Sequence, residues 1–228
     1  MCRMLAYHGN NKAELERLVG CLIRAANKDP LRNGVKHGDG WGIVAIDSEG
    51  IIYYRSKNPI YTEANLLTSL IGKLKGEFKV IIHARQASDK SLVSSYYSHP
   101  YMDYNDKFII YLAHNGSIDK DKLSSSLGID ASKMVDSELA LKYISLKGLD
   151  SVKELESYTQ TALNLFLLVI RRGEDPISAK LYYYNYYKKL GDEYYKLYVN
   201  GNAVYSSSLA YTGCERGNEA KLSILSEI

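Results

Sequence analysis

The chain begins Met1-Cys2-Arg3-Met4-Leu5-Ala6-Tyr7, and the interpretation of the whole sequence starts from this stretch. Its apolar residues predict a strand over residues 3–8. Cys2 directly follows the initiator methionine, so removal of Met1 would leave a thiol and a free α-amine on one residue. An α-amine with a pKa of about 7.7 to 8 is able to take the thiol proton, and thiolates are strong nucleophiles. The alternative is that Cys2 is a small buried residue of the strand.

Short polar motifs stand beside apolar runs further along the chain. They are His37-Gly38-Asp39-Gly40-Trp41-Gly42-Ile43, His83-Ala84-Arg85-Gln86-Ala87-Ser88, Ser98-His99-Pro100-Tyr101, His114-Asn115-Gly116-Ser117 and Asp136-Ser137-Glu138. Together with Cys2, and in this order, they resemble the class II glutamine amidotransferases, which are N-terminal-nucleophile hydrolases with a catalytic cysteine. The resemblance covers residues 2 to about 140. The Met-Cys-Arg-Met-Leu start is most similar to the small stand-alone members that have no synthase domain.

The resemblance implies an α+β fold, a four-layer αββα sandwich in which two antiparallel sheets lie between helical layers. A length of 228 residues suits one large domain, so residues 1–228 are expected to form a single glutamine amidotransferase domain. Periodicity predicts helices and strands that alternate at first and mainly strands later. The expected helices are 12–26, 62–74, 119–127, 137–147 and 151–162, and the expected strands are 41–47, 51–56, 78–84, 108–113, 165–170 and 203–207.

Three further segments carry predictions of their own. Residues 28–40 are rich in glycine and are expected to form a loop that approaches a substrate closely, since glycine has no Cβ. Residues 86–107 are predicted to be a long loop, and long loops are commonly functional. The tyrosine-rich segments 181–187 and 194–199 are expected to pair as a hairpin around Gly191-Asp192. Their tyrosines are expected to cover a half-exposed sheet rather than to stack nucleic-acid bases.

The resemblance assigns the expected catalytic residues. Cys2 would attack the carboxamide carbon, and the α-amine of Cys2 would carry protons, through a bridging water. Asn115 with its side-chain amide and Gly116 with its backbone N–H would stabilise the oxyanion. For Asn115-Gly116 the alternative is a hairpin turn. His114 is expected to be a hydrogen-bonded neighbour.

The expected substrate-binding residues follow from the same resemblance. Arg85 would bind the α-carboxylate with two parallel donors, and Asp136 would accept from the α-ammonium. Their alternatives are a surface ion pair for Arg85 and a helix N-cap for Asp136. Ser88 would hold the glutamate end and His99 would lie near the site, whereas Gln86 stands where the family often has an aromatic residue. Gly40 and Trp41, with Asp39, are expected to shape the pocket wall, Trp41 mainly from the core.

Composition excludes several other classes of protein. A net charge of +3 is too small to indicate nucleic acid or an anionic membrane as a partner. No apolar run approaches the roughly 18 residues that span a bilayer, and no signal peptide is recognisable, so a cytoplasmic location is expected. The three cysteines have no CxxC spacing and are expected to be reduced thiols. The spacing of His8, His37, His83 and His99 does not resemble a metal motif, so neither a metal nor a cofactor is expected.

Two functional classes remain. The first is an enzyme that hydrolyses glutamine or a small γ-glutamyl molecule, with a separate ammonia-accepting synthase as a further partner in the manner of some relatives. No P-loop or Rossmann motif is present, so a synthetic half-reaction would belong to another protein. The second class is a catalytically silent binding or regulatory module that keeps the pocket and uses the tyrosine-rich hairpin as an interaction surface.

Overall fold

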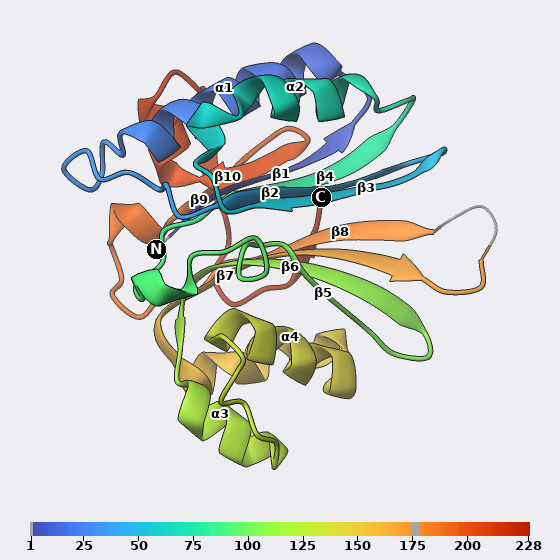
Figure 1. Cartoon of the computed structure of the whole chain (residues 1–228), viewed down its shortest axis with the longest axis vertical. Coiled ribbons are helices and arrows are strands. Elements are labelled where there is room, and N and C mark those ends of the chain that lie inside the picture. Colours follow the sequence, from blue (N-terminus) through green and yellow to red (C-terminus); the bar gives the residue numbers. More distant parts are fainter. Residues whose placement is uncertain (1, 175–177) are drawn as a thin grey trace.

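Two antiparallel sheets lie face to face, and helices cover the outer face of each sheet (Figure 1). The computed structural model describes residues 2–174 and 178–228. Helices α1 and α2 cover one sheet, and α3 and α4 cover the other. The expected fold class, an α+β sandwich with the layer order αββα, is therefore confirmed.

The first sheet has seven strands in the order β11-β9-β10-β1-β4-β2-β3. Their bounds are β1 Arg3–Gly9, β2 Trp41–Asp47, β3 Gly50–Ser56, β4 Phe78–Ala84, β9 Leu197–Asn200, β10 Ala203–Ser206 and β11 Asn218–Glu219. The second sheet has five strands in the order β12-β8-β7-β6-β5. Their bounds are β5 Tyr101–Tyr104, β6 Phe108–Ile118, β7 Thr159–Arg171, β8 Ala179–Tyr184 and β12 Ser226–Glu227.

The helices connect and cover these strands. Their bounds are α1 Lys12–Asn27, α2 Ala64–Gly72, α3 Lys120–Leu127 and α4 Asp136–Lys147, with 3₁₀ segments η1 Ile60–Thr62, η2 Lys90–Leu92, η3 Leu149–Tyr158, η4 Glu193–Tyr195 and η5 Ser207–Tyr211. Helix α1 begins where the side chain of Asn11 accepts a hydrogen bond from the backbone N–H of Glu14. Its buried face includes Leu15, Leu18 and Leu22, the spacing that the sequence predicted.

Side-chain alternation sorts the core into three layers. On β1, Leu5 and Tyr7 pack toward the helices, whereas Met4 and Ala6 pack between the two sheets. On β6, Ala113 packs between the sheets as well. Because residues two apart on a strand point to the same side, Cys2 and Asn115 both face the layer between the sheets. The side chains at the start of β1 and near the end of β6 therefore point into the same layer of the core.

Two predicted elements are wrong. The expected helix 151–162 is the 3₁₀ segment η3 followed from Thr159 by β7, because Thr159 pairs with Ile118 of β6. The expected tyrosine-rich hairpin does not form, since β8 pairs with β7 in one sheet and β9 pairs with β10 in the other. The predicted loop 86–107 also contains the short strand β5.

Most tyrosines of the two segments are buried or half-buried rather than free to form a binding surface. The hydroxyl of Tyr184 donates to Glu156 at 2.5 Å, and that of Tyr187 donates to Glu219 at 2.8 Å. Burial of the ring together with a hydrogen bond at its tip is the usual arrangement for tyrosine in a sheet.

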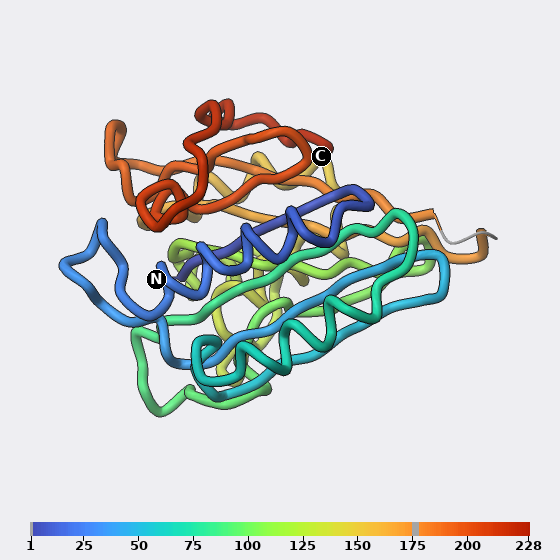
Figure 2. Tube along the Cα trace, turned by 90° about the horizontal axis from the view of Figure 1, so that it is seen from above, coloured from blue at the N-terminus to red at the C-terminus, as the bar shows by residue number. Residues whose placement is uncertain are grey.

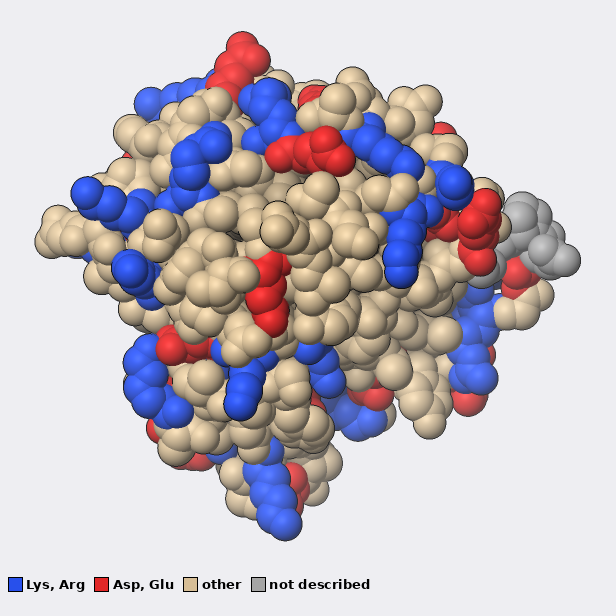
Figure 3. Space-filling model, turned by 45° about the horizontal axis from the view of Figure 1, so that its top comes forward, with Lys and Arg blue, Asp and Glu red and all other residues tan. Residues whose placement is uncertain are grey.

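On the face drawn in Figure 3, basic and acidic side chains are interspersed, and no continuous field of one sign forms. Within residues 2–174 and 178–228, no helix has both the length and the apolar character required to cross a membrane.

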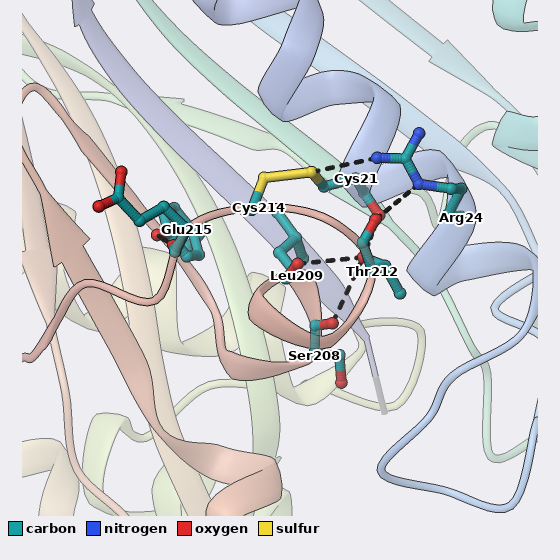
Figure 4. Close-up of a disulfide and its surroundings, with 8 residues drawn as sticks. Cys21, Arg24, Ser208, Leu209, Thr212, Cys214 and Glu215 are labelled. Atoms are coloured by element: carbon teal, nitrogen blue, oxygen red, sulfur yellow. Dashed lines mark hydrogen bonds between the residues drawn. A yellow bond between two sulfur atoms is a disulfide. The ribbon is translucent and has the colours of Figure 1, made fainter.

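A disulfide joins Cys21 of α1 to Cys214 near the end of the chain (Figure 4). The expectation of three reduced thiols is therefore wrong, and the cysteine argument for a reducing compartment is lost. The two residues are 193 positions apart, so no local spacing could reveal the pair. They meet because η5 and the segment after it pack beside α1 (Figure 2), where Arg24 donates to the carbonyl oxygen of Thr212 at 2.6 Å.

Thiol counting tests this disulfide. The chain has three cysteines and Cys2 is the free one, so the unfolded chain is expected to titrate as one thiol before reduction and as three after it. Replacing both Cys21 and Cys214 with serine should lower the free energy of unfolding by about 2–4 kcal/mol, because the crosslink restricts the unfolded chain. Urea denaturation measures the change. Three reactive thiols in the unreduced chain would contradict the assignment.

Candidate active site

A pocket of about 540 Å³ opens where the first sheet meets the second at the beginning of β1. Its walls come from the end of β4 and the segment after it, the end of β6, the first turn of α4 and the start of β7. Of the nine residues predicted to act in catalysis or substrate binding, six line the pocket: Cys2, Arg85, Ser88, His99, Gly116 and Asp136. These residues are far apart in the sequence, and the two stacked sheets bring them together. Asn115 lies next to the lining residue Gly116 but does not itself line the pocket.

Cys2 and Asn115 are directly hydrogen-bonded. The backbone nitrogen of Cys2 donates to Oδ1 of Asn115 at 2.9 Å. The Nδ2 of the same amide is buried and has no hydrogen-bond partner among the described residues. A buried amide donor without a partner is costly unless a ligand or water accepts from it. The predicted removal of Met1 concerns a residue outside those described.

At position 116 both the backbone conformation and the neighbouring atoms require a glycine. Its φ is +152°, and a Cβ at this position would lie 1.8 Å from the carbonyl oxygen of Ala162 on β7. The β6–β7 register shifts between Gly116 and Ile118, so the pair Asn115-Gly116 stands at a strand irregularity. The alternative of a hairpin turn is therefore wrong, because β6 continues to Ile118.

The thiol of Cys2 is acidic for a cysteine. Cys2 is buried, with Sγ 3.9 Å from the carbonyl oxygen of Gln86. Burial by itself would raise the pKa of the thiol, but the nearby His83, the positive charge at the N-terminus and Gln86 together outweigh burial and lower that pKa to about 6. Cys2 is consequently a thiolate at neutral pH, which is unusual for a buried cysteine.

Two further histidines lie around the pocket. The imidazole of His99, which precedes Pro100 in a cis peptide bond, is buried and has no hydrogen-bond partner on either nitrogen among the described residues. Burial, followed by the nearness of His83, holds the pKa of His99 well below its usual value, so this ring is neutral. His114 contacts the hydroxyl of Ser137 at 2.9 Å and the carbonyl oxygen of Ala162 at 3.2 Å, in keeping with the hydrogen-bonded role expected for it.

Arg85 stands in the pocket wall and is tied to both neighbouring loops. Its backbone nitrogen donates to the carbonyl oxygen of Gly40 at 2.8 Å, and its Nη1 donates to that of Leu92 at 2.8 Å. Asp39 accepts from the backbone nitrogen of Ala87 at 2.8 Å and pairs with Lys90. The glycine-rich loop thus braces the wall from behind. Arg85 is 6% exposed and has no acidic side chain as its partner among the described residues, which contradicts the surface ion pair.

Asp136 is the first residue of α4, and Val135 is the N-cap, so the N-cap alternative for Asp136 is wrong. Its Oδ2 accepts from the backbone nitrogen of Ile118 at 2.9 Å, and its Oδ1 accepts from that of Ser137 at 2.8 Å. A carboxylate has about four acceptor positions, so both oxygens retain capacity for a further donor from the pocket. Ser88 lies exposed among the lining residues.

Gly40 and Trp41 do not line the pocket. Trp41 is fully buried among the residues packed under α1 and α2, where its Nε1 donates to Glu63 at 2.7 Å. Alternation along β2 turns its ring toward the helices, so a direct contact with a substrate is ruled out for Trp41. At Gly40, where φ is +120°, a Cβ would lie 2.2 Å from Oγ of Ser98. Gly40 therefore supports the wall by allowing close packing behind it.

Sequence reasoning missed part of the lining. Lys120, Gln160 and Thr161 also face the pocket. Thr161 belongs to β7, and its hydroxyl bonds that of Ser117 on β6 at 2.9 Å. The only available signal was the polar pair Gln160-Thr161, and the wrong helix prediction for residues 151–162 concealed it.

A buried ionic network anchors Arg3, the residue next to Cys2, and no local sequence pattern predicts it. Arg3 and Asp29 are both fully buried, with Nε of Arg3 2.6 Å from Oδ2 of Asp29. Asp29 also accepts from His37 at 2.7 Å and from Ser208 at 2.7 Å. The guanidinium of Arg3 lies 3.6 Å from the ring centre of Tyr194. Four separated segments therefore converge on the start of β1.

The charge state of this network follows from its contacts. Burial opposes ionisation of Asp29, but the hydrogen bond from His37 and the charge of Arg3 outweigh burial and hold the pKa of Asp29 well below its usual range. Burial also lowers the pKa of His37, which is therefore a neutral donor to the carboxylate. The network is a buried ion pair completed by neutral hydrogen bonds.

Asp29→Asn is expected to lower the free energy of unfolding at pH 7 by about 3–5 kcal/mol, because it leaves Arg3 buried without a counter-charge. The pKa of Asp29 is depressed in the folded state, so its contribution is present above the unfolded value of about 3.9 and is lost as the pH falls below it. The difference between wild type and variant should therefore shrink between pH 5 and pH 2. Urea titrations over this range measure it, with the exposed Asp106→Asn as control. An unchanged stability at pH 7 would refute the network's role.

Two solved structures are similar to this chain over most of their length. A glutamine aminotransferase class-II domain protein from Silicibacter pomeroyi is 16% identical with a TM-score of 0.49, and the match covers 100% of this chain and 98% of that one. A predicted glutamine amidotransferase from Pseudomonas aeruginosa is 12% identical with a TM-score of 0.30, over 90% and 78% of the two chains. No protein-family model and no curated protein sequence matches this chain. At such identities and scores, the likeness adds no argument about activity to the geometry above.

Proposed function

We propose that this protein hydrolyses the side-chain amide of glutamine, or a γ-glutamyl amide, through a thioester on Cys2. One observation carries the proposal above all. The backbone nitrogen of Cys2 is hydrogen-bonded to Asn115, whose own Nδ2 is buried without a partner among the described residues beside a pocket that the thiol lines. A nucleophile beside an unused buried donor is the arrangement that acyl transfer requires.

The proposed reaction has two halves. The sulfur of Cys2 attacks the amide carbon, and Nδ2 of Asn115 with the backbone N–H of Gly116 stabilises the resulting oxyanion. The C–N bond breaks, the leaving amine takes a proton, and a thioester remains. Water then attacks the thioester and releases glutamate. In the proposed mature chain, which lacks Met1, the α-amine of Cys2 carries the protons in both halves.

The two ends of the pocket suit a zwitterionic amino acid. Arg85 is the cationic wall residue and is proposed to bind the α-carboxylate, while Asp136 is proposed to accept from the α-ammonium. Ser88 and His99 are proposed to complete the glutamate-binding end. A volume of about 540 Å³ also accommodates an amide larger than that of glutamine. A γ-glutamyl conjugate is therefore retained beside glutamine as the proposed substrate.

The alternative of a silent binding module loses its main support, because the tyrosine-rich hairpin that it required does not form. A separate synthase that accepts ammonia remains a prediction from the resemblance.

The direct test is hydrolysis of glutamine and of a panel of γ-glutamyl amides by the chain without Met1. Release of glutamate should be measurable, and Cys2→Ala should abolish it while leaving the circular dichroism spectrum unchanged, because the thioester cannot form. A trapped acyl-enzyme detected by intact mass would locate the thioester. The proposal fails if no member of the panel is hydrolysed, or if Cys2→Ala retains the activity.

Asn115→Ala tests the oxyanion contact. We expect kcat to fall by about 10² to 10³ with a much smaller change in KM, since the oxyanion exists only in the transition state. Steady-state kinetics with glutamine gives both constants. Asn58→Ala, which removes an exposed amide far from the pocket, is the control. If the variant shows a raised KM and an unchanged kcat, Asn115 binds the substrate in the ground state and does not stabilise the oxyanion.

A further inference from the structure

His83 is a buried histidine whose tautomer follows from its contacts. Its Nε2 lies 3.1 Å from the carbonyl oxygen of His114. A carbonyl oxygen only accepts, so Nε2 must carry the hydrogen, and in the neutral ring Nδ1 is then the basic atom. That Nδ1 is buried and makes no hydrogen bond of proper geometry to a described residue. A buried basic nitrogen without a hydrogen-bond partner is able to accept a proton from a neighbouring donor.

The thiol of Cys2 is the neighbouring donor. In the β1–β4 pairing, Met4 stands opposite His83 and Arg3 opposite Ala84, so Cys2 is the diagonal neighbour of His83. Met4 and Cys2 share one side of the strand, and Ile81, two residues before His83, also packs between the sheets. The sulfur and the imidazole therefore face the same buried layer.

The neighbouring His99 stays neutral, which leaves His83 as the ring available to accept a proton from Cys2. The ring of His99 stacks on His83 with 4.1 Å between centroids, and two such rings do not both become charged. His99 has the depressed pKa and stays neutral. The other titratable or charged groups around Cys2 and its histidines, on every element packed against them, are Arg85, His114, Asp136, Arg55, Tyr101 and Tyr194. The carboxylate of Asp136 is the acidic member of this set.

We propose that His83 is a catalytic residue that takes the proton of Cys2 and holds the nucleophile as a thiolate–imidazolium pair. The proton leaves Sγ and is bound by Nδ1, and no other bond changes. This proposal rests on the function proposed above but adds a second base, because the thiolate then forms without the α-amine. The acidity of the Cys2 thiol, to which His83 contributes the main lowering effect, supports it.

The experiment measures thiolate formation and not turnover. The rate of alkylation of Cys2 by iodoacetamide is followed against pH in the native wild type, with the disulfide intact. For the chain with Met1 attached we expect a midpoint near pH 6. In His83→Gln, whose amide nitrogen still donates to the carbonyl oxygen of His114, the midpoint should move to about 8.5 or above. At pH 6.5 the rate should then fall roughly 50- to 100-fold, in line with the thiolate fraction.

His8→Gln is the matched control, because it removes a histidine from the same sheet near the opposite end of β1 and should leave the midpoint unchanged. An unchanged midpoint in His83→Gln overturns the proposal. A wild-type midpoint above about pH 8 also overturns it, without reference to any variant. Absence of hydrolysis with a normal alkylation profile refutes the proposed function alone, whereas hydrolysis with an unshifted His83→Gln profile refutes only the role of His83.

Discussion

The hydrogen bond from the backbone nitrogen of Cys2 to Asn115 is the contact on which the proposed site depends. It joins Cys2, which directly precedes β1 of the seven-stranded sheet, to Asn115 on β6 of the five-stranded sheet. The bond fixes the nitrogen and leaves the sulfur beside the pocket. It also commits Oδ1 of the amide, so that Nδ2 is the remaining donor of Asn115, and this atom has no hydrogen-bond partner among the described residues.

That contact is held in place from behind. Arg3 is locked between Asp29 and Tyr194, so the chain enters β1 at a fixed position. On the opposite wall, the glycine-rich loop braces the segment after Arg85 through Asp39. Precise placement of a nucleophile needs this second set of contacts, since a displacement of about 1 Å is enough to reduce the rate of a reaction greatly.

Local sequence patterns predicted much of this molecule, and their failures have a common cause. Strands β1, β2 and β4 and helix α1 were predicted within a residue or two, because alternation and helical spacing depend on near neighbours. The Cys21–Cys214 disulfide and the Arg3–Asp29 pair join residues distant in the chain, and no single-sequence pattern encodes them. The tyrosine segments were assigned to one hairpin, whereas two sheets compete for them. Of the site, six lining residues were predicted from the order of the motifs. The roles of Trp41 and His83 depend instead on side-chain direction, and that of Gly40 depends on the close packing of its backbone.

The covalent link between α1 and the C-terminal segment closes a ring of chain from Cys21 to Cys214, and this ring includes most strands of both sheets. A protease that cuts a loop anywhere between residues 21 and 214 would leave the two pieces attached to each other until a reductant is added. Backbone breakage and loss of the last strands are therefore separate events in this protein, because the piece that carries β1 stays linked to the piece that carries β11.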